Sequence, residues 1–156
     1  MRIELTQGKV ALVDDADGVE LQKHKWCAMH VYNCWYAVRR PTHNGPLELM
    51  HRTILDPPSG LEVDHINLDG LDNRRENLRV ASRQQNSRNT RPRTNAVSRF
   101  KGVSRNLRGG RPWRGRIVVD RREIGLGYFT TEAEAALAYN EAATRLFGEY
   151  ALLNEV

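Results

Sequence analysis

Hydrophobic and polar positions alternate in short runs along the first 46 residues. The runs at residues 3–5, 10–13 and 35–39 repeat with a period of two, which predicts short, half-buried β-strands. The acidic run at residues 14–18 ends in glycine and predicts a turn between two of them. We therefore expect a small β-rich region at residues 1–46.

The pattern then changes to helical spacing and back. Apolar residues recur at roughly helical spacing over residues 47–55, and the sequence Asp-Pro-Pro-Ser-Gly at 56–60 ends this predicted helix. The elements that follow are a strand, a polar loop and a short strand, at residues 61–65, 67–76 and 78–80. Ser82, with Gln85 three residues later, has the pattern of a capping box, so a helix is predicted to start there.

A third pattern begins with residues 90–97, which are polar, interrupted by proline and without periodicity. They predict a flexible basic linker. Three further strands are predicted, at residues 102–105, 113–119 and 122–126. Thr131 and Glu134 form a second capping box, and the apolar stripe of the helix that follows ends at Gly148. The fold class is therefore α+β, and its last domain, at 98–156, is a three-stranded antiparallel sheet backed by one helix.

Charge is distributed very unevenly along the chain. The net charge of +5 combines a net of −2 over residues 1–80, from 10 Lys and Arg against 12 Asp and Glu, with a net of +12 over residues 81–122. Twelve of the 13 cations in that second segment are Arg, the side chain best suited to bidentate contacts with phosphate and guanine. Arg114 and Arg116 alternate with apolar residues, which predicts a basic outer face on the sheet. A block of one sign repels itself without a polyanion, so nucleic acid is expected here in preference to a merely solubilising surface.

The remaining composition excludes several classes of protein. No apolar run is long enough to cross a membrane, and the N-terminus lacks the features of a secretory signal, so a cytoplasmic location is expected. The two cysteines, Cys27 and Cys34, have no second Cys or His pair at the spacing of a zinc clip. Structural zinc and a disulfide are therefore not expected, and both cysteines are interpreted as packing residues.

The candidate chemistry lies in the segment of two strands and a helix. Hydrolysis of a phosphodiester needs a hard divalent cation, a base for the attacking water and a group that fixes this base. Asp64 and the amide oxygen of Asn86 are oxygen ligands that suit a single Mg²⁺ or Mn²⁺ ion. The pKa of a histidine lies near neutrality, so His65 is the candidate general base. Backbone carbonyls of the polar loop are expected to hold the second nitrogen of His65, and Asn77 is expected to tie this loop closed.

Three positions leave alternatives open. Neighbouring strand residues face opposite sides, so Asp64 and His65 share a site only if the strand end twists or bulges. His51 either flanks the site and contacts phosphate, or is a packed or solvated histidine at a helix start. Trp113 either stacks or inserts at DNA, or packs between sheet and helix.

The residues around this site resemble a known family. The sequences Val-Asp-His-Ile-Asn at 63–67 and Leu-Asp-Asn-Arg-Arg-Glu-Asn-Leu-Arg at 71–79, followed by Asn86 and Asn89, resemble the HNH endonucleases of phages and group I introns. The third position of the motif, a His in many members, is Asn86 here, as in the H-N-N branch of the family. The resemblance implies a ββα-metal nuclease fold within residues 1–89.

The same resemblance implies roles for individual residues. It implies a catalytic core at about residues 47–89, with His65 as the general base and Asn77 as the structural middle residue of the motif. It implies Asp64 and Asn86 as the ligands of the divalent ion. Two further residues are possible members of the site, His51 and Asn89.

A second resemblance covers residues 98–156. The sequences Phe-Lys-Gly-Val at 100–103, Leu-Gly-Tyr-Phe at 126–129 and Thr-Glu-Ala-Glu-Ala-Ala-Leu-Ala-Tyr-Asn at 131–140 resemble the Apetala-two (ethylene-response-factor) DNA-binding domain. This implies a three-stranded sheet laid in the major groove. The positions that match its reading surface are Lys101, Ser104, Asn106, Arg116, Val118, Glu123 and Gly125. Phosphate contacts are expected from Arg105, Arg108, Arg111, Arg114, Arg121 and Arg122.

The sequence therefore predicts a metal-dependent endonuclease that cuts or nicks duplex DNA, targeted by its C-terminal domain. The family implies a homing or free-standing mobile enzyme of a phage or intron, acting in a bacterial host cell. A single active site per chain suggests a monomer that nicks DNA, or a weak dimer that cuts both strands. The alternative is a sequence-specific DNA-binding regulator with an inactive nuclease fold. The presence of the whole expected residue set favours the enzyme. An RNA-binding protein is less well supported, because the aromatic pairs and glycine-rich loops of common RNA modules are missing.

Overall fold

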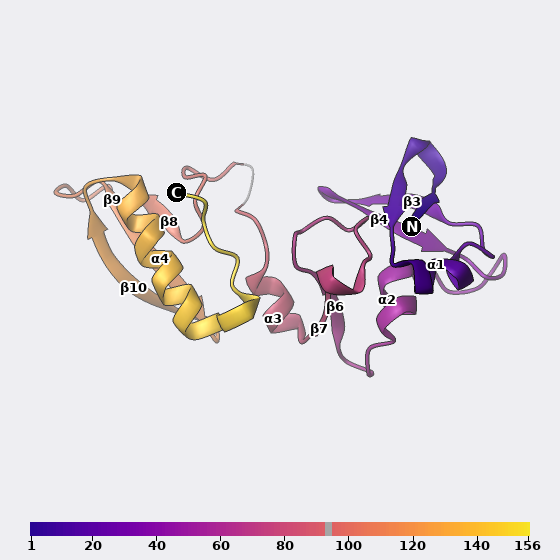
Figure 1. The fold of residues 1–156 in the computed structure, drawn as a ribbon. Helices are drawn as coiled ribbons and strands as arrows, with labels where there is room; N and C mark the ends of the chain where they lie inside the picture. Colours follow the sequence, from indigo (N-terminus) through magenta and orange to yellow (C-terminus); the bar gives the residue numbers. More distant parts are fainter. Residues whose placement is uncertain (93–94) are drawn as a thin grey trace. The chain divides into compact units, whose positions relative to one another are not determined.

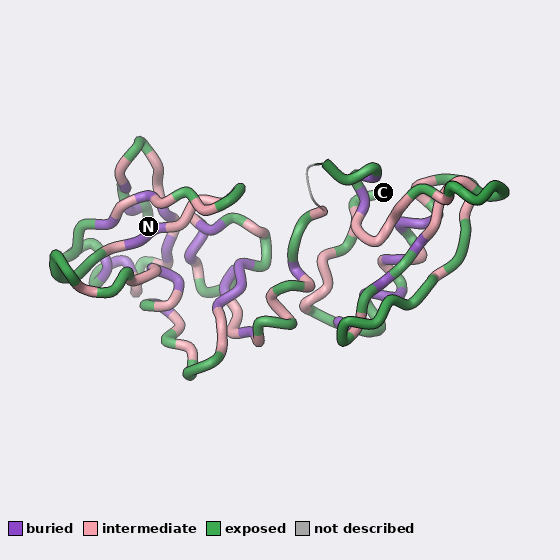
Figure 2. Tube along the Cα trace, turned by 180° about the vertical axis from the view of Figure 1, so that it is seen from behind, coloured by how far each residue is buried: buried purple, intermediate pink, exposed green. Residues whose placement is uncertain are grey.

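The computed structural model describes residues 1–92 and 95–156, and the predicted linker at 90–97 includes the two residues outside these ranges. The described residues form two compact units, Met1–Ser87 and Arg88–Val156. Buried segments occur in both units (Figure 2), and each unit has a hydrophobic core of its own. No helix in the described ranges is both long and apolar enough to cross a membrane.

The N-terminal unit consists of small antiparallel sheets and short helices (Figure 1). Its elements in chain order are β1 (Arg2–Glu4), β2 (Val10–Leu12), α1 (Asp15–Leu21), β3 (Cys27–Val31), β4 (Cys34–Arg39), β5 (Glu48–Leu49), α2 (Met50–Leu55), β6 (Glu62–His65), β7 (Leu78–Ala81) and α3 (Arg83–Arg88). β1 pairs with β2, β3 to β5 form one sheet, and β6 and β7 form a separate hairpin. α3 follows this hairpin directly and ends one residue into the second unit.

The core of the N-terminal unit joins the sheets through α2. Trp26 and Met50 are almost completely buried, and the Trp26 indole donates a hydrogen bond of 2.9 Å to the carbonyl of Leu21. α2 contacts β4 and both strands of the β6–β7 hairpin. One face of the hairpin is therefore covered by α2.

Two predictions for this unit are wrong. Residues 14–18 begin helix α1 instead of forming a turn, because acidic residues in a first helical turn are stabilised by the helix dipole and Leu21 packs into the core. The helix predicted at 47–55 begins only at Met50, because the two residues before it pair with β4 as β5. Strand β3, which pairs with β4, was not predicted.

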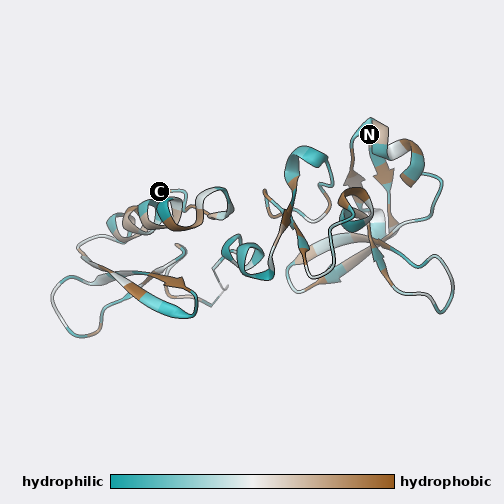
Figure 3. Cartoon of the chain, turned by 90° about the horizontal axis from the view of Figure 1, so that it is seen from below, coloured by the Kyte–Doolittle hydropathy of each residue, from teal (hydrophilic) through white to brown (hydrophobic). Residues whose placement is uncertain are grey.

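The C-terminal unit is a three-stranded antiparallel sheet covered by one helix, as predicted (Figure 3). Its elements are β8 (Val103–Arg105), β9 (Trp113–Val119), β10 (Arg122–Phe129) and α4 (Glu132–Phe147). β9 lies in the centre of the sheet. The capping box of Thr131 and Glu134 is present at the start of α4. The chain thus combines helices with small sheets, as the α+β prediction requires.

Helix α4 approaches its sheet closely. Ile117 of β9 is buried against Tyr139, Ala143 and Phe147 of the helix. Gly102 has a φ of +76°, and a Cβ atom there would lie 2.1 Å from the Tyr139 ring. Only glycine fits this position, which lets the chain enter β8 directly beneath the helix.

Candidate functional site

His65 is buried at the end of β6. Only 7% of the residue is exposed, and its Nε2 lies 3.2 Å from Oδ1 of Asn73. The Nδ2 of Asn73 donates to the carbonyl of Leu71, which directs the amide oxygen toward His65. Nε2 of His65 is therefore the donor in this pair. In the neutral ring, Nδ1 is then the nitrogen that can accept a proton.

Asn73 itself is fixed by the polar loop and β2. It is fully buried, and its backbone N–H donates a 2.7 Å bond to the carbonyl of Leu12. Leu12 in turn donates a 2.8 Å bond to the carbonyl of Leu71. Sequence reasoning expected backbone carbonyls of this loop to hold His65, and gave Asn73 no role. The sequence did offer one signal for this role, because the Asn73 amide, in the same loop, can both donate and accept hydrogen bonds.

Asn77 spans the base of the same loop. Its Oδ1 accepts a 2.9 Å bond from the backbone of Asn67, and its Nδ2 donates a 2.7 Å bond to the carbonyl of Asp72. Its own carbonyl accepts from Ile66 at 2.9 Å. These three bonds join the two ends of the loop, as expected for a residue that ties the loop closed.

Two further aromatic side chains pack around His65. The ring centroid of His51, from α2, lies 4.9 Å from that of His65, with the ring planes almost perpendicular at 88°. Tyr36 of β4 contacts both rings, with centroids 5.8 and 6.0 Å away. His51 is buried and its Nδ1 has no hydrogen-bond partner in the described ranges, so a solvated surface role is excluded. Sequence reasoning did not identify Tyr36.

Burial favours the uncharged form of these three rings. It lowers the pKa of His51 to about 3, and the neighbouring His65 and Arg52 act in the same direction. Burial also lowers the pKa of His65, although its bond to Asn73 and the carboxylate of Asp64 oppose this effect. The pKa of Tyr36 rises to about 12, mainly through burial. His65 is consequently neutral, the form in which a histidine acts as a base.

Asp64 lies on the other face of the hairpin. The register of β6 with β7 is regular from Glu62 to His65, so the bulge considered from the sequence is absent and alternate residues face opposite sides. Asp64 stands opposite Arg79, whose Nε and Nη2 donate bonds of 2.8 and 2.6 Å to its Oδ2. His65 is the last residue of β6, so its side chain and the Asp64 carboxylate lie at the same end of the hairpin, and this carboxylate opposes the lowering of the pKa of His65 by burial.

Asn86 lies over the same face as Asp64. Its Nδ2 donates a 2.6 Å bond to Oε2 of Glu62, which shares the face of Asp64 because the two are separated by one residue of the strand. Sequence reasoning missed Glu62, although its spacing from Asp64 was a usable signal. The described residues include no group of three or more His, Cys, Asp and Glu arranged to hold a metal ion. Two carboxylates and one amide are nevertheless the oxygen donors that suit Mg²⁺ or Mn²⁺, which need few protein ligands.

The predicted DNA-binding residues lie on the C-terminal unit in three settings. Arg114 and Arg116 face outward from β9, and both form ion pairs with Glu123. Lys101 donates bonds of 2.5 and 2.8 Å to the carbonyls of Arg88 and Thr90, and burial lowers its pKa to about 8. Of the other predicted contacts, Ser104 and Asn106 are half-buried, and the exposed ones are Arg105, Arg108, Arg111, Val118, Arg121, Arg122 and Gly125.

Two residues whose roles the sequence left open lie in this unit, Trp113 and Asn89. Trp113 is half-buried, and the guanidinium of Arg105 lies over its ring at 4.7 Å. Asn89 follows α3 and is buried within the C-terminal unit.

A hairpin followed by a helix that carries a buried neutral histidine and oxygen donors for a divalent cation holds the groups that hydrolysis of a phosphodiester requires. Residues 56–88 match the family model described as HNH endonuclease. A segment of 99 residues is 35% identical to an uncharacterized HNH endonuclease of Acanthamoeba polyphaga mimivirus. That alignment covers 64% of this chain and 50% of the relative, so the chain spans about half the length of the curated relative it matches. No solved structure matches the chain. The hairpin-and-helix segment is thus similar to HNH endonuclease domains, a family that suggests a nuclease acting on DNA.

Proposed function

We propose that the chain is a DNA endonuclease that hydrolyses phosphodiester bonds in duplex DNA with the help of Mg²⁺ or Mn²⁺. One observation carries this proposal. His65 is buried, neutral and held at Nε2 by Asn73, within the segment that matches the HNH endonuclease family. A histidine held in this way presents Nδ1 as a proton acceptor in one orientation.

His65 acts as the general base. Its Nδ1 takes a proton from a water molecule as the water oxygen forms a bond to phosphorus. The bond from phosphorus to the 3′ oxygen breaks, and this oxygen takes a proton from solvent. The products are a 5′-phosphate and a 3′-hydroxyl. Asn73 keeps the imidazole in the required tautomer, because its amide oxygen accepts the hydrogen on Nε2.

Asp64 and Asn86 are the residues that would hold the metal ion, with Glu62 beside them. A bound Mg²⁺ or Mn²⁺ supplies Lewis-acid stabilisation of the charge on the leaving oxygen. Arg79 fixes one oxygen of Asp64 through two bonds, which orients the carboxylate on the hairpin. Asn77 maintains the polar loop that carries Asn73. His51 packs edge-on against His65 and is a positioning residue for this base.

The C-terminal unit is proposed to bind and target the duplex as an Apetala-two type domain. Its support is the outward-facing arginines of a three-stranded sheet together with the net charge of +12 over residues 81–122. The contacts are assigned to Lys101, Ser104, Arg105, Arg108, Arg114, Arg116, Arg121 and Arg122. A role as a mobile endonuclease is proposed as well, and its support is the viral origin of the similar protein. The enzyme is proposed to act as a monomer or weak dimer.

Cleavage of supercoiled plasmid and of duplex DNA from the home locus tests the nuclease proposal. We expect nicked or linear product with Mg²⁺ or Mn²⁺ and none with EDTA. His65→Ala should lower the cleavage rate by about 10³-fold, within the range for loss of a general base. DNA binding should stay at the wild-type level, since His65 is buried. Binding without metal-dependent cleavage by the wild-type protein would instead support the regulator.

A further inference from the structure

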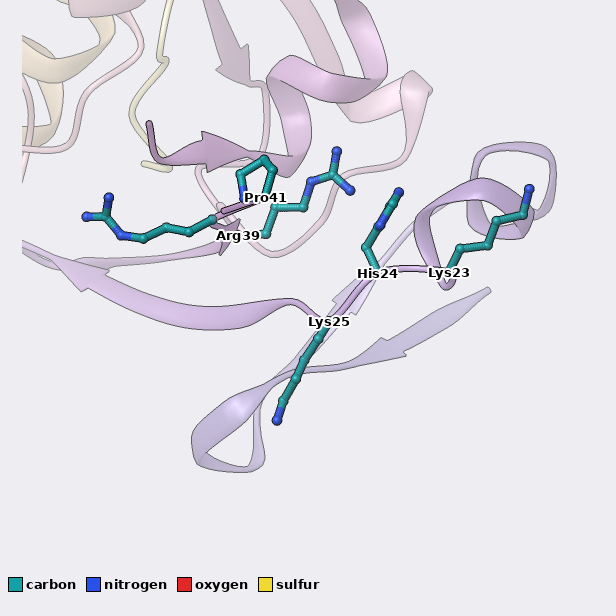
Figure 4. A pocket seen from close by; sticks show the side chains of 6 residues that line it. Lys23, His24, Lys25, Arg39 and Pro41 are labelled. Atoms are coloured by element: carbon teal, nitrogen blue, oxygen red, sulfur yellow. The ribbon is translucent and has the colours of Figure 1, made fainter. Parts of the chain in front are cut away.

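A group of cations on the N-terminal unit takes no part in the site around His65. It lies where the chain passes from α1 to β3 and where β4 ends, and it surrounds a surface hollow of about 330 Å³ (Figure 4). We call this feature the basic hollow. It is lined by Lys23, His24, Lys25, Arg39, Arg40 and Pro41.

The β3–β4 hairpin brings these residues together. Cys27 pairs with Val38 in an antiparallel register, so the residues before β3 adjoin the residues after β4. Arg39 is held in place, because its guanidinium lies over the Trp26 ring at 5.1 Å and its Nε donates a 2.7 Å bond to Glu48. Arg40 donates a 2.9 Å bond to the carbonyl of Gly45. Both guanidinium groups are thereby restrained at the rim of the hollow.

The basic hollow is an exception within an acidic region. Residues 1–80 carry 10 Lys and Arg, and four of these line the hollow, while no carboxylate does. Lys23 pairs with Glu20 and Arg39 with Glu48, which neutralises part of the charge. Lys25 and Arg40 form no ion pair within the described ranges, so the group keeps a net positive charge.

We propose that the basic hollow binds the phosphate backbone of the duplex on which the N-terminal unit acts; this inference rests on the proposed nuclease function. The hollow is lined by two lysines, two arginines, a histidine and a proline, and this excess of positive charge without a carboxylate suits the phosphate backbone. Lys23 and Lys25 extend in opposite directions (Figure 4), so they suit neighbouring phosphates of a strand better than one small anion. The hollow thus gives the N-terminal unit a DNA contact of its own.

Salt-dependent binding by the full chain tests this proposal. Affinity for two duplexes of unrelated sequence is measured in EDTA over a range of salt concentrations, for the wild type and for Lys25→Ala/Arg40→Ala. Affinity falls as the salt concentration rises. Loss of two phosphate contacts should make the slope of log affinity against log salt shallower by about 2 and weaken binding about tenfold at low salt. Lys25→Ala alone, which changes one exposed side chain, should lower the slope by about 1. The control is Arg2→Ala/Lys9→Ala, which removes two cations elsewhere in the same unit and should leave the slope within about 0.5 of the wild type.

Three outcomes would overturn the proposal. These are an unchanged slope in both Lys25 variants, an equal loss in the control, and a loss confined to one of the two sequences. Failure of the nuclease proposal is distinguishable, because it appears as absence of cleavage by the wild type with Mg²⁺, while the binding slopes remain measurable. If both proposals hold, the double variant should cleave at the wild-type rate once DNA is saturating, because the hollow lies outside the catalytic group.

Discussion

The polar side chains of the two units differ in burial and in hydrogen bonding. Around His65, polar groups are buried and joined by specific hydrogen bonds to Asn73 and through the polar loop. On the C-terminal sheet, most arginines project from exposed positions. Proton transfer requires one acceptor in one orientation, whereas phosphate contacts require only positive charge close to the backbone. We therefore expect substitutions in the first unit to remove activity, and substitutions in the second to change affinity gradually.

The largest effect that would sharpen this comparison is expected from Asn73. Replacing Asn73 by Ala removes the acceptor for Nε2 of His65, so the imidazole is no longer held in one tautomer and orientation. The single-turnover cleavage rate at saturating DNA should fall about 10²-fold, with unchanged affinity for DNA.

Asn73→Asp separates positioning from mere structural support. Asp keeps an oxygen that accepts from Nε2, and its negative charge raises the pKa of His65. This variant should recover most of the rate and shift the pH profile of cleavage upward. An Ala variant that cleaves at the wild-type rate, or an Asp variant with the wild-type profile, would contradict the positioning role.

The same contrast explains how much of the fold could be predicted. The C-terminal unit follows its sequence pattern closely, because its hairpins and the capping box of α4 depend on residues close together in the chain. In the N-terminal unit, residues 14–18 have the composition of a turn but form α1. There Asp14 accepts a 2.7 Å bond from the backbone of Arg75, and Asp17 pairs with its guanidinium. Such partners lie far apart in sequence and leave no local pattern.

The candidate site divides in the same way. Asp64, His65, Asn77 and Asn86 were predicted because their residue types occur at family spacing. The packing of Tyr36 and His51 on His65 joins β4, α2 and β6, which only the tertiary fold brings together. Gly70 illustrates the fit between these elements, since a Cβ atom there would lie 2.7 Å from the Tyr36 ring.

A smaller effect, on stability, is expected from His51. Its pKa is about 3 in the folded protein, because burial disfavours the charged ring, and about 6.5 when unfolded. Between these values the unfolded chain binds the extra proton, so this contribution is complete above pH 6.5 and is lost as the pH falls toward 3. The free energy of unfolding should decrease by about 1.4 kcal/mol per pH unit in this window from His51 alone.

His51→Phe keeps an aromatic ring in this position and removes the titrating group. Urea unfolding of both proteins at pH 7.5 and pH 5.5 checks the prediction. Between these two pH values, the free energy of unfolding of the variant should fall by about 1.4 kcal/mol less than that of the wild type. Equal pH dependence in the two proteins would show that His51 is not buried in its neutral form. The contribution of His65, whose pKa is also lowered by burial, remains in both proteins and cancels in the comparison.

The smallest effect is expected on the outer face of the C-terminal sheet, and it should be a gain. Glu123 pairs with both Arg114 and Arg116, so its carboxylate neutralises part of the surface that is proposed to face DNA. Glu123→Gln should tighten binding about threefold at low salt and make the salt dependence steeper, because two guanidinium groups become available to phosphate. Glu141→Gln, which removes an exposed carboxylate from α4, is the matched control and should change affinity less. Exposed ion pairs contribute under about 1 kcal/mol, so thermal stability should hardly change. Weaker binding by Glu123→Gln would mean that Glu123 orients these arginines for DNA, and the exposed face would then depend on fixed geometry as the buried site does.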